Sequence, residues 1–252
     1  MPLYRDGVRE TLAAELLDAP ARIGGWRGFL FLAGFAGVLG VYFPWSLGQD
    51  FMDPFFQIVY ACSAPLFQSQ ITIASFTEDK HRRMLEGWWE APCPQPEFLL
   101  GKIAATAIAG FAGALLLYAL SLATLSVVHG NGRLLLPGAA FLVPLLATGA
   151  AFSVLSAHIG ATLALRVQTP TEARRSVRTA FLAVLVAIAA LGPYTPAVVK
   201  GWIARAFLPE TLPWVAAAAI AALLASSYVL WRWCLARIQN ARANQGGLSL
   251  FR

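Results

Sequence analysis

Long apolar segments alternate with short polar connectors along the whole chain. Most of these segments hold at least the roughly twenty residues that an α-helix needs to cross the hydrocarbon core of a bilayer. The expected spans cover residues 28–47, 54–76, 98–128, 134–165, 179–191 and 212–233, and the fifth is the shortest. This pattern predicts an all-α polytopic membrane protein whose six-helix transmembrane domain occupies residues 28–236.

The two ends of the chain are more polar than the spans. In residues 1–27, Val8, Leu12 and Leu16 recur every four residues while charged side chains fill the other face. This spacing is typical of an amphipathic helix that lies in the membrane interface. Residues 237–252 are polar and basic, and we expect them to form a cytoplasmic tail.

The stretch before the last span is neither a simple loop nor a full span. Prolines recur through it, and apolar side chains such as Trp202 and Phe207 alternate with Lys200 and Arg205 at helical spacing. Broken backbone at membrane depth is tolerated where it is buried in protein or meets water. We therefore predict a re-entrant segment over about residues 194–213.

The second span is the most polar of the six. Its polar and small residues step by three, four and seven positions, so they share one helical face. Such a face either packs against neighbouring helices through hydrogen bonds or lines a substrate path, and both interpretations stay open. The path candidates are Gln57, Gln68, Thr72 and Ser75.

Composition and charge agree with a membrane protein. The chain is 58% hydrophobic and 13% charged, whereas charged residues make up about a quarter of a soluble domain. All but three of its 19 Lys and Arg residues lie on one side of the predicted topology, and those three are Arg133, Lys200 and Arg205. The positive-inside rule then places both termini in the cytoplasm of a bacterial-type inner (plasma) membrane. The same distribution explains the net charge of +6 without a nucleic-acid partner.

Motifs for catalysis or cofactor binding are not found in the sequence. It has no G-x-x-x-x-G-K-[S/T] phosphate loop, no H-E-x-x-H pair and no G-x-S-x-G turn. Its three cysteines lack metal-ligand spacing. We expect no catalytic, cofactor-binding or metal residues in this chain, and we expect His158 to be a packing residue rather than a proton relay.

The most charged segment joins the second and third spans. Residues 82–91 favour a short helix that Pro92 ends, with Trp88 and Trp89 one turn from Met84 and Leu85. Trp and Arg often anchor protein contacts, which suits docking into a groove on a soluble partner. The alternative is an interfacial helix whose Trp side chains sit among lipid headgroups.

This organisation resembles an ABC-2 type transporter permease. The resemblance rests on six spans, the amphipathic N-terminal helix, the re-entrant segment before the last span, and the motif of the first cytoplasmic connector. In that family the connector carries an acidic, Arg-containing run, a Glu near a small residue, a Pro turn, a Glu, and a Gly-Lys that opens the third span. The matching residues here are Glu78, Arg82, Arg83, Leu85-Glu86-Gly87, Ala91-Pro92, Glu97 and Gly101-Lys102.

The resemblance implies a permease subunit of an ATP-driven ABC exporter. A coupling helix at about residues 83–91 would contact a separate ATPase, present in two copies that bind ATP and Mg, and two permease chains would form a homodimer around the substrate path. The implied coupling residues are Glu78, Arg82, Arg83, Leu85, Glu86, Gly87, Trp88, Trp89, Glu90 and Pro92. The implied outer-gate residues are Pro193, Tyr194, Trp202 and Phe207. The alternative function is a self-contained secondary carrier or channel.

Overall fold

A computed structural model describes the long helices of the chain and several shorter pieces. The described residues are 9, 11–17, 30, 33–34, 36–52, 68, 72–73, 75–77, 95–166, 172, 179, 205, 208 and 210–243. Regular secondary structure within these residues is helical throughout. The elements are the π-helix η1 (Ala36–Tyr42), α3 (Phe43–Leu47), the 3₁₀-helix η2 (Gly48–Met52), α6 (Gln95–His129), α7 (Ala139–Arg166) and α10 (Leu212–Ala243).

Three of these helices are long and apolar enough to cross a membrane: Pro96–His129 within α6, Ala139–Arg166, and Leu212–Asn240 within α10. They coincide with the third, fourth and sixth expected spans, so the helical, membrane-embedded character of the chain is confirmed. The coupling helix lies outside the described residues, as do most of the second span, of the fifth span and of the re-entrant segment.

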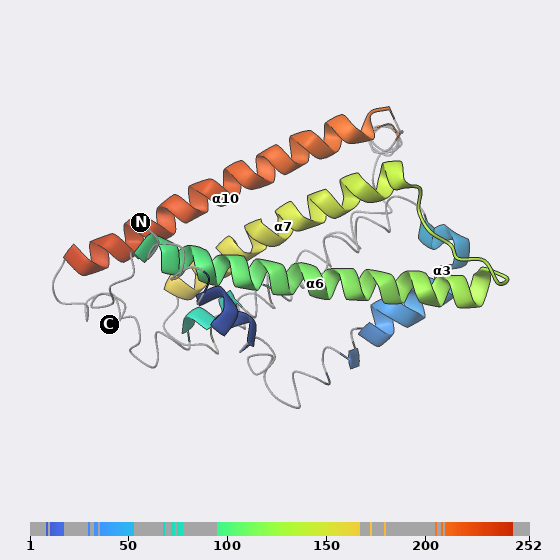
Figure 1. The fold of residues 1–252 in the computed structure, drawn as a ribbon, viewed down its shortest axis with the longest axis horizontal. Helices are drawn as coiled ribbons and strands as arrows, with labels where there is room; N and C mark the ends of the chain where they lie inside the picture. Colours follow the sequence, from blue (N-terminus) through green and yellow to red (C-terminus); the bar gives the residue numbers. More distant parts are fainter. Residues whose placement is uncertain are drawn as a thin grey trace.

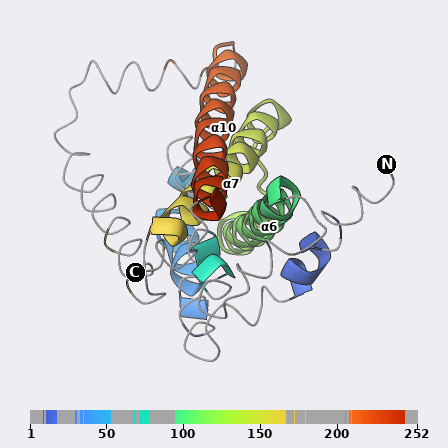
Figure 2. The same ribbon diagram turned by 90° about the vertical axis from the view of Figure 1, so that its left-hand side faces the viewer.

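The three long helices form a bundle in which α6 runs antiparallel to α7, while α10 runs parallel to α7 (Figure 1). Figure 1 shows α7 returning alongside α6 and α10 lying along α7, and Figure 2 looks down the same bundle from its end. The start of α6, the end of α7 and the end of α10 therefore meet at one end. This end carries Lys102, Arg166 and Arg237, and we call it the charged end. The turn between α6 and α7 lies at the opposite end.

The fourth span begins later than the sequence pattern predicts. Residues 134–138 are irregular, and α7 starts at Ala139, where the amides of Phe141 and Leu142 both donate to the Gly138 carbonyl at 2.9 Å. Pro137 explains the delay, because proline disfavours helical backbone in the residue before it. Conversely, α10 continues past the expected end of the sixth span to Ala243, into residues we had assigned to the tail.

The far part of the first expected span is not one regular α-helix. The π-helix η1 changes there into the short helix α3, which has Pro44 in its first turn. Pro44 has no N–H to donate to the carbonyl of Gly40, four residues earlier. Thr124 Oγ1 of α6 lies 3.0 Å from that carbonyl and equally close to the Leu120 carbonyl of its own helix, so its single hydroxyl proton is shared between the two acceptors. A Cβ at Gly40 would lie 2.6 Å from Leu120, so glycine permits this close approach to α6.

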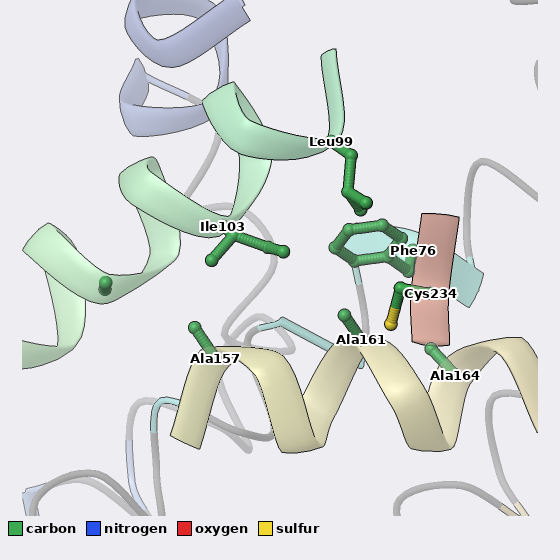
Figure 3. Close-up of a cluster of buried hydrophobic side chains, with 8 residues drawn as sticks. Phe76, Leu99, Ile103, Ala157, Ala161, Ala164 and Cys234 are labelled. Atoms are coloured by element: carbon green, nitrogen blue, oxygen red, sulfur yellow. The ribbon is translucent and has the colours of Figure 1, made fainter. Parts of the chain in front are cut away.

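Small apolar side chains close the bundle at the charged end. Ala157 and Ala161 of α7 are fully buried. They pack in one cluster with Ile103 of α6, with Cys234 of α10 and with Phe76 from the end of the second expected span (Figure 3). Alanines let helix backbones approach closely, which is how helices associate where lipid removes the hydrophobic driving force. This cluster holds the end of the second span, α6, α7 and α10 together.

Candidate functional site

The polar face of the second span turns toward neighbouring helices. Its described members, Gln68, Thr72 and Ser75, are all fully buried, whereas Gln57 lies outside the described residues. Thr72 donates its hydroxyl to the Gln68 carbonyl of its own helix at 3.0 Å. This arrangement matches the helix-packing interpretation of the face, and the pathway role of these residues stays a prediction.

Gln68 connects two of the long helices. Its side chain lies against Gly110 of α6, where an added Cβ would come within 2.4 Å of Gln68 Cγ. Its Nε2 donates to the Ser153 carbonyl of α7 at 2.7 Å. Gln68 Oε1 and Ser153 Oγ are buried with no hydrogen-bond partner among the described residues. These two oxygen atoms could therefore still form hydrogen bonds inside the bundle.

A buried ion pair lies at the charged end of the bundle. Lys102 Nζ is 2.9 Å from Glu15 Oε1, and the two side chains are 1% and 8% exposed. Ser75 Oγ donates to Glu15 Oε2 at 2.9 Å and lies 2.9 Å from Lys102 Nζ. Each of the three side chains thus contacts the other two, and they come from the N-terminal helix, the second span and α6.

Aromatic rings complete the surroundings of the ammonium group. Lys102 Nζ lies 5.1 Å from the centroid of the Phe76 ring and 5.6 Å from that of Phe98, both within the range of a cation–π contact. We call Glu15, Ser75, Phe76, Phe98 and Lys102 the Lys102 cluster. A charge this deeply buried is tolerated only with a partner and further hydrogen bonds, and the cluster supplies both.

The Lys102 cluster includes residues that precede and residues that follow the charged connector, which the sequence predicts to dock onto a partner. Residues 75–77 lead into the charged connector, and α6 begins at Gln95 on its far side. Contact between Ser75 and Lys102 therefore joins the two ends of the connector. The structure also brings residues 11–17 to this point, and Figure 1 shows that short helix beside the start of α6. The implied coupling residues Glu78–Pro92 and the outer-gate residues lie outside the described residues.

Sequence reasoning found two members of the ion-pair network and missed the third. Lys102 was the residue that opens the third span, and Ser75 belonged to the polar face of the second. Glu15 was not singled out, although it lies between Leu12 and Leu16, beside the apolar face of the amphipathic helix. An acidic residue next to an apolar face is the signal that would have pointed to a buried partner.

Arginines around one tryptophan form a second contact at the charged end. Arg166, the last residue of α7, has its guanidinium carbon 4.9 Å from the centroid of the Trp233 ring. Arg237 lies 5.9 Å from the same ring. Both distances fit cation–π contacts, and Trp with Arg suits the level of the lipid headgroups.

Long apolar helices tied together at a charged end by a buried ion pair define the class of this chain as a polytopic helical membrane protein. Within that class, comparison with known proteins adds no family: no protein-family model matches the chain, and no curated protein matches its sequence.

Proposed function

We propose that this chain is the transmembrane permease subunit of an ATP-driven exporter of the ABC-2 type. The observation that carries the proposal is the contact of Lys102 with Ser75 and Glu15 at the base of the charged connector. The proposal further rests on the six apolar segments, the basic residues on one side of them, and the connector motif.

A docking segment must pass its displacement on to the transmembrane helices. A flexible connector would absorb the movement of a bound partner, whereas a connector with joined ends moves the helices that hold those ends. The 2.9 Å contact between Ser75 and Lys102 joins the second span to the second turn of α6. In our proposal, a force on residues 83–91 therefore reaches both helices together.

The energy for transport would come from a partner. The chain has no phosphate loop, so the ATP and Mg would bind to two copies of a separate ATPase. We assign the docking contact to residues 78–92, with Trp88 and Trp89 as its apolar anchors. The Glu15 ion pair would fix the N-terminal helix next to this docking segment.

The remaining parts of the transporter follow from the same assignment. Two copies of the chain would enclose the substrate path, with both termini in the cytoplasm and the charged end facing the ATPase. The segment at residues 194–213 would close the outer side of the path.

The test is coupled ATP hydrolysis. The chain would be co-expressed with candidate ATPase subunits of the same organism, and the purified complex would be assayed in lipid vesicles. We expect the two proteins to copurify and hydrolyse ATP, and we expect Glu86→Arg or Trp88→Ala to weaken assembly or uncouple hydrolysis. Trp214→Ala is the matched control, because Trp214 is an exposed tryptophan at the end of the bundle opposite the charged end.

Two results would contradict the proposal. If the ATPase binds and turns over normally with both Glu86 and Trp88 changed, the connector is not the coupling site. If the chain alone moves a solute across vesicle membranes without nucleotide, it is a self-contained carrier or channel.

A further inference from the structure

A cavity of about 450 Å³ lies between α7 and α10, in the half of the bundle away from the charged end. Its volume falls within the range of small-molecule sites, roughly 300–1,000 Å³. Large apolar side chains form much of its wall: Phe141, Leu145 and Phe152 from α7, and Leu212, Val215 and Leu223 from α10.

The cavity exists because small residues face each other there. Ala216, Ala219 and Ala222 of α10 and Gly149 of α7 all line the cavity, and no large side chain of the described residues fills the space between them. At the charged end the alanines of α7 pack directly against neighbouring helices, as the cluster in Figure 3 shows. The same two helices are therefore tightly packed at one end and separated at the other.

Among the described residues, the lining of the cavity carries no charged side chain and no free hydrogen-bond donor. Its two hydroxyl groups belong to Thr148 and Ser226. Thr148 donates to the Pro144 carbonyl and Ser226 to the Ala222 carbonyl of its own helix, both at 2.8 Å. A buried water needs two to four polar partners, and the described lining offers only the acceptor lone pairs of these two hydroxyls. The chemistry of the wall therefore selects a hydrocarbon.

The size and shape of the cavity suit a long chain rather than a compact molecule. A cavity of about 150 Å³ holds one benzene ring, so three times that volume accommodates roughly eighteen carbon atoms. The lining extends along α10 from Leu212 to Ser226, a distance of about 21 Å at the helical rise per residue. An extended acyl chain has this form.

The surroundings of the cavity identify the source of such a chain. Val215, which lines the cavity, is 41% exposed, and Trp214 beside it is 79% exposed. On α7, Val143 is 65% exposed next to the lining residue Pro144. Because both helices are long and apolar enough to span a membrane, we expect these exposed apolar side chains to face the hydrocarbon of the bilayer.

We propose that the α7–α10 cavity holds one acyl chain of a bilayer phospholipid from the leaflet opposite the charged end. The chain fills space that the alanines leave open and restores van der Waals contacts to the walls. Its headgroup stays at the membrane surface near the start of α10. This inference depends on the membrane character of the helices and not on the permease assignment.

The test measures bound phospholipid directly. The full chain would be reconstituted in vesicles of palmitoyl-oleoyl phosphatidylcholine doped with a phosphatidylcholine that carries a diazirine in its acyl chain. After irradiation, peptide mapping should find the label on cavity residues of α7 and α10. Native mass spectrometry of the detergent-purified chain should find one retained phosphatidylcholine per chain.

Variants that fill the cavity should remove both signals. Ala219→Trp places a large ring inside the cavity, and Ala219→Leu does so with a smaller change should the first variant unfold. Ala218→Trp is the matched control, since Ala218 is exposed and lies outside the lining. We expect loss of the retained lipid in either Ala219 variant and its persistence in the control.

Other outcomes would overturn the proposal. Equal lipid retention in Ala219→Leu, Ala218→Trp and the unchanged chain would place the lipid elsewhere. Loss of self-association in the Ala219 variants, with no lipid retained by the unchanged chain, would show that a second copy covers this face.

Discussion

At the scale of single residues, the protein places a few polar groups deep in an apolar bundle and provides each with a specific neighbour. Lys102 has Glu15 and Ser75, and Gln68 has the Ser153 carbonyl. A polar group that loses its partner in such surroundings keeps its full desolvation cost. The effects of substitutions at these residues should therefore be large and should depend on the partner.

Removing the Lys102 ammonium should strongly destabilise the protein. Lys102→Met leaves the Glu15 carboxylate buried without its cation, a change that costs about 3–5 kcal/mol when a buried pair is broken. The measurement is the unfolding midpoint in detergent micelles. Arg133→Met is the matched control, because Arg133 lies in the exposed turn after α6.

Exchanging the charges of Glu15 and Lys102 tests whether their ion pair stabilises the protein or whether these positions simply tolerate no substitution. Glu15→Lys and Lys102→Glu should each be at least as damaging as Lys102→Met, since each places like charges together. The double variant should recover much of the lost stability. If the double variant is no more stable than the single ones, the pairing is not what stabilises this end.

Gly110 should tolerate no side chain. In Gly110→Ala the new Cβ would meet Gln68 Cβ, Cγ and Cδ at 2.4–2.5 Å. Overpacking of this kind costs about 1–3 kcal/mol. The same exchange at Gly113, where nothing lies within 4 Å, should be neutral or stabilising by about 0.5–1 kcal/mol because alanine favours helix. Unfolding midpoints of the two variants, measured side by side, check the prediction.

At the scale of elements, the first expected span shows how one residue changes a helix and how a neighbour compensates. Pro44 has no N–H for the Gly40 carbonyl four residues earlier, and Thr124 of α6 places its hydroxyl 3.0 Å from that carbonyl. The irregular helix therefore depends on α6 for a hydrogen bond that a regular helix makes by itself.

A double-mutant cycle tests this dependence. Thr124→Val should cost about 1–3 kcal/mol, because it leaves a partly buried carbonyl without a donor. In a Pro44→Ala background the restored N–H can serve Gly40, so the same Thr124→Val change should cost less. Unfolding in detergent measures all four proteins. Equal costs in the two backgrounds would mean that Thr124 does not compensate for the proline.

At the scale of the whole molecule, the bundle has two different ends. Lys102, Arg166, Arg237 and the buried alanine cluster share the charged end, whereas the other half of the bundle carries the exposed turn at Asn131 and the cavity. This polarity is what the positive-inside rule predicts for a membrane protein with one fixed orientation.

Thiol labelling checks the orientation. With the native cysteines replaced, Asn131→Cys should react with a membrane-impermeant maleimide added outside intact cells. Asn240→Cys, near the end of α10, should react only after the cells are opened. Both positions are exposed in the bundle, so access to the reagent reports the side of the membrane. The reverse labelling pattern would invert the topology.

Much of the helical architecture could be predicted from the sequence because the signal is local. About twenty consecutive apolar residues identify a span without any knowledge of its neighbours, and α6, α7 and α10 lie where the hydropathy pattern expects them. Boundaries were predicted less well. The start of α7 depends on Pro137, and the extension of α10 on a run of good helix formers after the apolar core.

The sequence by itself determined that the chain is a helical membrane protein with its basic residues concentrated on one side. Only the tertiary structure decided that Glu15 meets Lys102, that Gln68 packs against Gly110, and that α7 and α10 leave a cavity. These features depend on which faces of separate helices come together. Helix periodicity predicts that one face of a helix is polar or lined with small residues, but it does not predict which other helix packs against that face. Buried partners and cavities can therefore be identified only once the packing of the helices is known.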